Sequence, residues 1–316
     1  MYVGLDIGGT KCAAVVGNLG DSYEILEKIS FPTAGKTPDD VLSLFSEFIK
    51  IQLKKHKIEG IGIACGGPLD SKKGIVKKPA SLPLWDGIKV VEYFENKFGI
   101  PTYLKNDADA CAVAEWKYGA GRGTENMIFI TFGTGFGSGL ILNGRLYSGT
   151  NDNGGEIGHV RLRKTGPVGF GKEGSCEGFC SGSGLRRFAL LELDKLRKKG
   201  KSDPEFLKEI GGDENITAKV MAEYARKGDK FCKRIYTESG KKLGEALSIL
   251  IDLFNPQKII IGGVFMRSKD LLLPHALKVI EKETISYSRE ICSVEPAMLY
   301  ENIGDVSALV VAKGDL

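Results

Sequence analysis

The chain has 316 residues, with 44 lysines and arginines against 40 aspartates and glutamates, so its net charge is +4. Hydrophobic residues make up 42% and charged residues 27%, the balance of a folded globular protein rather than a disordered one. At about 100–200 residues per domain, this length predicts two domains. So small a net charge argues against nucleic acid as a partner.

Three further features of the sequence indicate the cellular compartment. No run reaches the roughly 18 apolar residues of a membrane span, and Met1–Asp6 lacks the regions of a signal peptide. The seven cysteines lie in apolar contexts without paired spacing. We therefore expect a cytoplasmic protein with reduced, buried thiols and no membrane partner.

The first half of the chain alternates predicted strands and helices. Short apolar runs at 2–7 and 12–16 flank a tight glycine turn and predict a hairpin. A helix is expected to begin at Pro38, because acidic residues suit its first turn and apolar residues then follow a helical stripe. The other expected elements are strands at 23–31, 58–65 and 101–104, and helices at 90–98 and 108–118.

The second half restarts the pattern. Runs at 127–132 and 138–142 predict two strands around another glycine turn, which suggests two related halves. Expected helices follow at 185–198, 218–226, 229–254, 271–283 and 306–313, with strands at 258–261 and 291–294. Strands alternating with helices predict an α/β fold.

The two glycine turns predict phosphate-binding sites. Glycine lets backbone N–H groups approach a polyphosphate closely. The first turn adds a carboxylate suited to Mg²⁺ and an ammonium group suited to phosphate. Its residues are Asp6, Gly8, Gly9, Thr10 and Lys11, and those of the second turn are Gly133, Thr134 and Gly135. One such turn alone would be interpreted as an ordinary hairpin, whereas two, one in each half, favour a nucleotide.

Two other nucleotide-binding motifs do not explain this sequence. The chain has no G-x-x-x-x-G-K-[ST] segment and is therefore not a P-loop protein. Residues 169–174 fit G-x-G-x-x-G, but they follow Thr165-Gly166-Pro167 rather than a strand, which argues against a dinucleotide fingerprint.

Several segments, taken in order, resemble the ROK (repressor, open reading frame, kinase) sugar kinases. They are residues 6–11, 106–108, 131–139, 155–159 and 262–263. The resemblance covers essentially the whole chain. It implies a two-domain actin-like and hexokinase-like (ribonuclease H-like) ATPase fold, with the active site in the cleft between domains. We expect domains at 1–118, joined by the C-terminal helix 304–316, and at 119–303; the resemblance also implies a homodimer.

Asp107 is the candidate catalytic base. Phosphoryl transfer to a sugar needs a carboxylate at the attacking hydroxyl, and Asp107 stands between a predicted strand end and a helix start, beside the Asn106 amide. Spacing alone favours an N-capping aspartate, but the resemblance implies the base. Family members often carry an acidic residue at the position of Lys105 and asparagine at that of Asp109, so these departures put the substrate preference in doubt.

The sugar pocket is implied by the same resemblance. Carboxylates accept two hydroxyls at once, and Glu156 lies three residues before His159. Taken alone, His159 could equally be a structural histidine. The resemblance places Gly67, Asn106, Glu156, His159 and Glu177 around the sugar, and Gly262 and Gly263 against the adenosine of ATP.

A structural zinc is not expected. Many ROK kinases bind Zn²⁺ through this histidine and three cysteines, but the matching positions here are Val168, Phe170 and Ser175, which are not zinc ligands. Cys176 and Cys180 lie out of register and are expected to be free buried thiols. We expect Val168 and Phe170 to bury apolar surface and brace the 161–174 loop instead.

The resulting hypothesis is an ATP- and Mg²⁺-dependent hexose kinase, with glucose 6-phosphorylation as the default. N-acetylmannosamine, N-acetylglucosamine, allose and fructose stay open as substrates. A ROK regulatory protein is the alternative, but the core begins at Asp6 and leaves no room for a DNA-binding segment. A chaperone-like or actin-like ATPase would not need the Glu-Ile-Gly-His segment.

Overall fold

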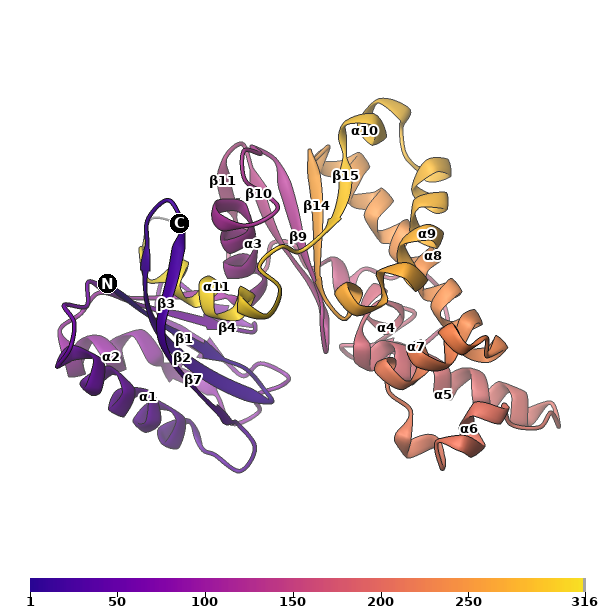
Figure 1. The fold of residues 1–316 in the computed structure, drawn as a ribbon, viewed down its shortest axis with the longest axis horizontal. Coiled ribbons are helices and arrows are strands. Elements are labelled where there is room, and N and C mark those ends of the chain that lie inside the picture. Colours follow the sequence, from indigo (N-terminus) through magenta and orange to yellow (C-terminus); the bar gives the residue numbers. More distant parts are fainter. Residues whose placement is uncertain (315–316) are drawn as a thin grey trace. The chain divides into compact units, whose positions relative to one another are not determined.

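The structure, a computed structural model, describes residues 1–314 and divides into two compact units (Figure 1). The first unit comprises residues 1–129 and 139–155 and the chain from Met298 onward. The second unit comprises residues 130–138 and 156–297. Within the described residues, no helix is long and apolar enough to cross a membrane.

The first sheet has the strand order β3-β2-β1-β4-β8. Strand β1 (Tyr2–Ile7) pairs antiparallel with β2 (Lys11–Leu19), which pairs antiparallel with β3 (Tyr23–Pro32). On its other side β1 pairs parallel with β4 (Gly60–Cys65), and β4 pairs parallel with β8 (Thr102–Asn106). The predicted hairpin is confirmed, and three parallel strands end at one edge of the sheet.

Helices α1 (Pro38–Leu53) and α2 (Val90–Phe98) cover one face of this sheet (Figure 1). Phe45 and Ile49 of α1 and Phe94 of α2 join the strand residues in one hydrophobic core. The predicted start of α1 at Pro38 is confirmed: Thr37 is the N-cap and forms a capping box with Asp40 in the first turn. This core holds the strands that carry the candidate site.

Helices α3 (Asp107–Tyr118) and α11 (Ile303–Val311) pack against the other face. Close approach of α11 depends on glycine: a Cβ at Gly62 would lie 2.2 Å from the carbonyl oxygen of Ala308 and from the nitrogen of Ala312. Small side chains of α3 and α11, including Ala110 and Ala308, form a second cluster with β4. The helix that carries Asp107 is thereby fixed on the sheet.

The second sheet has the order β11-β10-β9-β14-β15, which repeats the strand order of the first. Its members are β9 (Met127–Phe132), β10 (Phe136–Leu142), β11 (Arg145–Tyr147), β14 (Lys258–Gly263) and β15 (Ser293–Pro296). Strands β10 and β11 are antiparallel, and β14 and β15 are parallel. This repeat confirms the two related halves predicted from the glycine turns.

The second unit is rich in helices. They are α4 (Cys176–Phe179), α5 (Gly182–Lys198), α6 (Glu205–Glu209), α7 (Ala218–Lys227), α8 (Lys230–Phe254), α9 (Val264–Glu283) and α10 (Ser286–Ile291). Helices α8 and α9 form the most extensive helix pair, since glycines of α8 lie against Leu272 and Ala276 of α9.

Some element boundaries predicted from sequence were wrong. The helix expected at 271–283 begins at Val264, and a kink at Ser268 separates its first turn from the predicted part. The strand expected at 291–294 lies at 293–296, after the short helix α10. A three-stranded sheet was missed, formed by β5 (Leu69–Asp70), β6 (Ile75–Lys77) and β7 (Asp86–Lys89), because such short runs show no clear periodicity.

Candidate active site

Three strand ends bring the candidate residues of the first unit together. In the sheet register Ile7 lies opposite Cys65, and Cys65 lies opposite Asn106. Asp6, Gly66 and Asp107 therefore lie at the carboxyl ends of neighbouring parallel strands. In α/β sheets this edge is the usual place for ligands.

Asn106, rather than Asp107, is the N-cap of α3. Its Oδ1 accepts hydrogen bonds from the backbone N–H groups of Ala108, at 2.9 Å, and Asp109, at 3.4 Å. Asp107 is the first helical residue, and its Oδ1 accepts from the N–H of Ala108 at 2.8 Å. Spacing alone had favoured Asp107 as the cap, and that interpretation is wrong.

This capping arrangement leaves specific groups available for chemistry. Asp107 keeps access to solvent, yet the surrounding protein disfavours its charged form and raises the pKa of the carboxyl group. The Nδ2 of Asn106 lies 3.2 Å from the position that a Cβ at Gly67 would occupy. A donor amide and a carboxylate of raised pKa thus stand side by side at the strand end.

Asp6 lies in a negative environment. Burial, and to a lesser extent the charges of Asp107 and Asp305, raise the pKa of Asp6 to about 7 against the opposing charges of Lys11 and Lys28. Lys28 Nζ is 2.5 Å from Oδ2 of Asp305. A cation near Asp6 would relieve this repulsion.

The first glycine turn is held by a residue that sequence reasoning missed. Thr33, directly after β3, donates its hydroxyl to the carbonyl of Gly8 at 2.6 Å and its backbone N–H to the carbonyl of Thr10 at 3.0 Å. Ser81 lies against Gly9: a Cβ at Gly9 would be 2.5 Å from the Cβ of Ser81. Thr10 and Lys11 stay exposed.

The second glycine turn lies beside the diglycine of the adenosine motif. Gly263 has φ 71°, and a Cβ there would lie 2.4 Å from the carbonyl oxygen of Phe132 and 3.1 Å from the nitrogen of Gly133. Thr134 is exposed at the tip of its turn. The structure therefore brings together the two segments that the sequence assigned to ATP in this half.

Glu177 lies against the same turn. Its Oε2 accepts a hydrogen bond from the backbone N–H of Phe136 at 3.2 Å. The same oxygen is 2.8 Å from the position of a Cβ at Gly135. Glu177, which is predicted to bind the sugar, thus directly contacts the turn that is predicted to bind phosphate.

Glu156 precedes a short 3-10 helix (Ile157–His159) in the second unit, and His159 is the last residue of that helix. Both side chains are exposed. The His159 ring packs edge-on against Phe170 with ring centroids 5.9 Å apart, and Lys172 Nζ donates to the His159 carbonyl at 2.7 Å. The histidine therefore has a fixed position with its ring accessible.

The expected apolar brace for the 161–174 loop was wrong. Val168 and Phe170 are 45% and 59% exposed, so they bury little surface. Backbone hydrogen bonds hold the loop instead: Leu162 N–H donates to Gly174 O at 2.9 Å, and Gly174 N–H donates to Pro167 O at 3.1 Å. Within residues 1–314, no group of three or more His, Cys, Asp or Glu is placed to hold a metal ion.

The cysteines near this loop are free. Cys176 and Cys180 are buried and lie one helical turn apart around α4. Burial raises the pKa of the Cys180 thiol well above its usual range. All seven cysteines are free, as predicted, and five are buried. The prediction that all are buried was wrong for Cys111 and Cys292, which are partly exposed.

Two further contacts were not predicted. Ser148 Oγ donates to Oδ2 of Asp109 at 2.5 Å. Asp152 accepts from both the backbone N–H and the hydroxyl of Ser71, at 2.8 and 2.7 Å. The segment that precedes Glu156 is thus held within the first unit by two contacts to residues far away in the sequence, which local sequence patterns do not predict.

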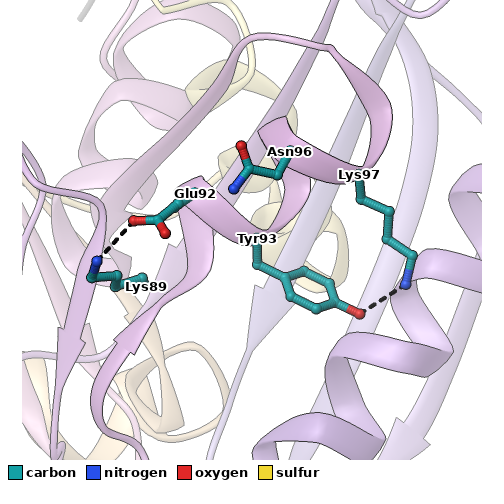
Figure 2. A pocket seen from close by; sticks show the side chains of 5 residues that line it. All are labelled: Lys89, Glu92, Tyr93, Asn96 and Lys97. Carbon is teal, nitrogen blue, oxygen red and sulfur yellow. Dashed lines mark hydrogen bonds and ion pairs between the residues drawn. The ribbon is translucent and has the colours of Figure 1, made fainter.

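A surface hollow of about 430 Å³ lies elsewhere, beside α2 (Figure 2). It is lined by Lys89, Glu92, Tyr93, Asn96 and Lys97. Lys89 pairs with Glu92 at 3.0 Å, and Lys97 donates to the Tyr93 hydroxyl at 2.9 Å. It contains none of the residues predicted to bind sugar or ATP, so we do not assign it to the active site.

The two five-stranded sheets have the same strand order, and a glycine turn follows the strand of each sheet that comes first in the chain, β1 or β9. This arrangement defines the hexokinase-like α/β class of fold. A family model described as "ROK family" matches residues 2–314. The chain belongs to the ROK family.

Relatives in this family include kinases and regulators. The glucokinase of Thermotoga maritima is 32% identical over 282 residues, covering 88% of this chain and 87% of that protein. The structure of a ROK family glucokinase from Streptomyces griseus, in complex with glucose and AMPPNP, has a TM-score of 0.80 and 29% identity, and the match covers 99% of each chain. The DNA-binding transcriptional repressor Mlc of Escherichia coli is 29% identical, covering 93% of this chain and 69% of the repressor.

Proposed function

We propose that the protein is an ATP-dependent hexose kinase that phosphorylates the 6-hydroxyl of glucose. The main support is the Asn106–Asp107 pair: Asn106 caps the helix, so the Asp107 carboxylate stays accessible at the strand edge that also carries Asp6. Similarity to glucokinases over most of the chain supports glucose as the first sugar to test.

Asp107 is the proposed general base. It accepts the proton of the sugar hydroxyl as that oxygen attacks the γ-phosphate of ATP. A raised pKa makes its carboxylate a better proton acceptor than an ordinary aspartate. The Asn106 amide, with its Oδ1 engaged in the cap, has Nδ2 left to donate to a sugar oxygen.

Sugar recognition is proposed to use both units. Gly67 and Asn106 belong to the first unit, and Glu156, His159 and Glu177 to the second. Carboxylates suit vicinal hydroxyls because each accepts two hydrogen bonds. The proposal requires both sets of residues to bind the same sugar molecule.

The proposed ATP-binding residues are the two turns and the diglycine. In the second unit, Gly133–Gly135 and Gly262–Gly263 are in contact, which supports their binding one nucleotide. In the first unit, Lys11 is exposed at the turn and suited to neutralise phosphate. Mg²⁺ is proposed to arrive with ATP, and when bound it neutralises charge on the phosphates.

Asp6 fits the role of holding Mg²⁺ through water. Its carboxylate lies among negative groups, so a cation is electrostatically favourable there. Mg²⁺ sites in kinases commonly use one or two carboxylates together with substrate phosphates. Among residues 1–314, no cluster of three or more such ligands is placed to hold a metal ion without the substrate, which suits that arrangement.

ADP release measured with a panel of sugars tests the function. The panel is glucose, N-acetylmannosamine, N-acetylglucosamine, allose and fructose, each with ATP and Mg²⁺. We expect ADP release that depends on the sugar and is fastest with glucose. ADP release at the same rate without sugar would contradict a sugar kinase, and a faster rate with another sugar would reassign the substrate.

A regulatory protein without kinase activity is the second candidate. The similarity to the repressor Mlc over 93% of this chain favours it. Such a protein would bind a sugar, detected by calorimetry, and release no ADP. The near balance of charge is the argument against nucleic acid as a partner.

Domain division, assembly and compartment stay predictions. Independent domains at 1–118 with 304–316, and at 119–303, would give stable fragments of those sizes on limited proteolysis. A homodimer would sediment at twice the chain mass of 34.2 kDa. Cytoplasmic localisation would appear in cell fractionation.

A further inference from the structure

The first turn of helix α5 is fastened to the second glycine turn. The backbone N–H of Gly182 donates to the carbonyl of Gly133 at 2.8 Å, and the hydroxyl of Ser183 donates to the carbonyl of Thr134 at 2.5 Å. A Cβ at Gly182 would also lie 3.3 Å from Cγ2 of Val264, the residue after the diglycine. All these residues belong to the second unit. The start of α5 therefore forms one structure with both proposed ATP segments.

Arg187, one turn further along α5, reaches back to this structure. Its Nη2 donates to Ser183 Oγ at 3.2 Å, so the guanidinium group is tied to the residue that contacts Thr134. Its Nε is shielded from solvent and has no hydrogen-bond acceptor within residues 1–314. Buried polar atoms are nearly always satisfied in proteins, and an unsatisfied one calls for a ligand or another explanation.

The neighbouring Arg186 shows what a purely structural arginine looks like on the same helix. Its Nε donates to the carbonyl of Ile216 at 3.1 Å, and its Nη2 donates to the carbonyl of Asp213 at 3.5 Å. Arg197, near the end of α5, forms ion pairs with Asp203 and Asp213. Arg187 has no carboxylate partner among the ion pairs of the described chain, although it lies next to a proposed phosphate site.

We propose that Arg187 is a nucleotide-binding residue whose Nε–H donates to an oxygen of the phosphate chain of ATP. This inference deepens the proposed kinase function and rests on it for the identity of the ligand. Arginine suits the role because its charge is permanent and its fork of N–H groups matches phosphate oxygens. Ser183 is then a positioning residue, since its hydroxyl links the guanidinium group to the Thr134 turn.

Equilibrium binding of ATP and of adenosine to Arg187→Met tests the proposal. A residue that contacts the phosphates affects ATP alone, whereas a disturbed helix affects both ligands. We expect the Kd for ATP to rise about 10- to 100-fold, as for a lost charged hydrogen bond, and the Kd for adenosine to change less than about twofold. In turnover, the KM for ATP should rise while the KM for the sugar stays within about twofold.

Arg186→Met is the matched control, because it removes the same side chain from the adjacent position of α5. It should leave the ratio of ATP to adenosine affinity unchanged, even if it lowers thermal stability. Arg187→Lys keeps the charge but loses the Nε–H, so it should weaken ATP binding by an intermediate factor and keeps the test valid if Arg187→Met does not fold. Ser183→Ala should also raise the Kd for ATP.

Different outcomes separate this proposal from the proposed function. The role of Arg187 would be overturned if Arg187→Met bound ATP with unchanged affinity, or if it lost equal affinity for ATP and for adenosine. Either result would leave the proposed kinase reaction unaffected. A wild-type protein that binds ATP through Arg187 without phosphorylating a sugar would overturn the kinase reaction alone. A wild-type protein that does not bind ATP would overturn both.

Discussion

Ser148 donates a hydrogen bond to Asp109 at 2.5 Å, two residues beyond the proposed base on the same helix. Asp109 is 3% exposed, and this burial is the main reason that its pKa is raised from 3.8 to about 6. The Ser148 hydroxyl and the Lys105 charge oppose the rise, while the charges of Asp152 and Asp107 add to it. The helix start therefore contains a carboxyl group that titrates near pH 6.

Replacing this carboxyl group is expected to stabilise the protein above pH 6. In the unfolded chain Asp109 ionises near pH 4, and in the folded chain near pH 6, so the free energy of unfolding falls as pH rises through that window. This decrease in the free energy of unfolding is at most about 3 kcal/mol. Asp109→Asn keeps an acceptor for Ser148 and removes the titration.

Urea unfolding of wild type and Asp109→Asn at pH 4.5 and pH 7.5 checks this prediction. The stability advantage of the variant should grow toward pH 7.5. Equal differences at the two pH values would show that Asp109 does not titrate with a raised pKa. Asp39→Asn, an exposed change in the first turn of α1, is the control and should show no such growth.

Glu115 is predicted to be a stabilising residue of the first unit. Its fully buried carboxylate accepts from the backbone N–H groups of Ala120, Met298 and Leu299, at 2.8, 3.2 and 2.8 Å. Glu115→Ala leaves three backbone donors, of which that of Leu299 is fully buried, without this acceptor and should lower the free energy of unfolding by about 3 kcal/mol. Thermal unfolding measures this, with the exposed Glu47→Ala as control; equal effects of the two changes would contradict the role.

Thr33 is predicted to position the first glycine turn. Thr33→Val keeps the shape but removes the donor to the Gly8 carbonyl, so the turn loosens and the KM for ATP should rise several-fold, with recovery in Thr33→Ser. Thr102→Val makes the same change at another buried threonine of this unit, where the hydroxyl donates to Ile100 O. If steady-state kinetics show the same KM in Thr33→Val and Thr102→Val, the positioning role is wrong.

Zinc is predicted to be absent from the working protein. Positions 168, 170 and 175 carry Val, Phe and Ser, and the loop around them is closed by backbone hydrogen bonds. Metal analysis of purified protein should find far less than one zinc per chain, and EDTA followed by fresh Mg²⁺ should leave activity and thermal stability intact. One tightly held zinc per chain would contradict the prediction.

Local signals in the sequence predicted much of the fold. The turn after Asp6 specified the first hairpin, and Pro38 with its acidic neighbours marked the start of α1. The second glycine turn correctly indicated a second half related to the first. These features depend on residues close together in the chain, where periodicity and capping rules apply.

Contacts across long sequence separations could not be predicted in this way. Thr33 braces Gly8 across 25 residues, and Ser183 reaches Thr134 across 49. The identity of the α3 cap was misjudged because Asn106 and Asp107 are both good capping residues, and only the backbone shows which precedes the first turn. Val168 and Phe170 were expected to be buried because they are apolar, but backbone bonds had already closed their loop.

The central claim is that Asp107 promotes phosphoryl transfer from ATP to the 6-hydroxyl of glucose. The most direct test is to identify the product by ³¹P and ¹H NMR after incubation of glucose, ATP and Mg²⁺ with wild type and with Asp107→Ala. We predict glucose 6-phosphate from wild type, and a kcat lower by about 10²–10⁴-fold or more in the variant, which still binds glucose. No phosphorylated sugar from wild type, or near-normal turnover by Asp107→Ala, would contradict the account.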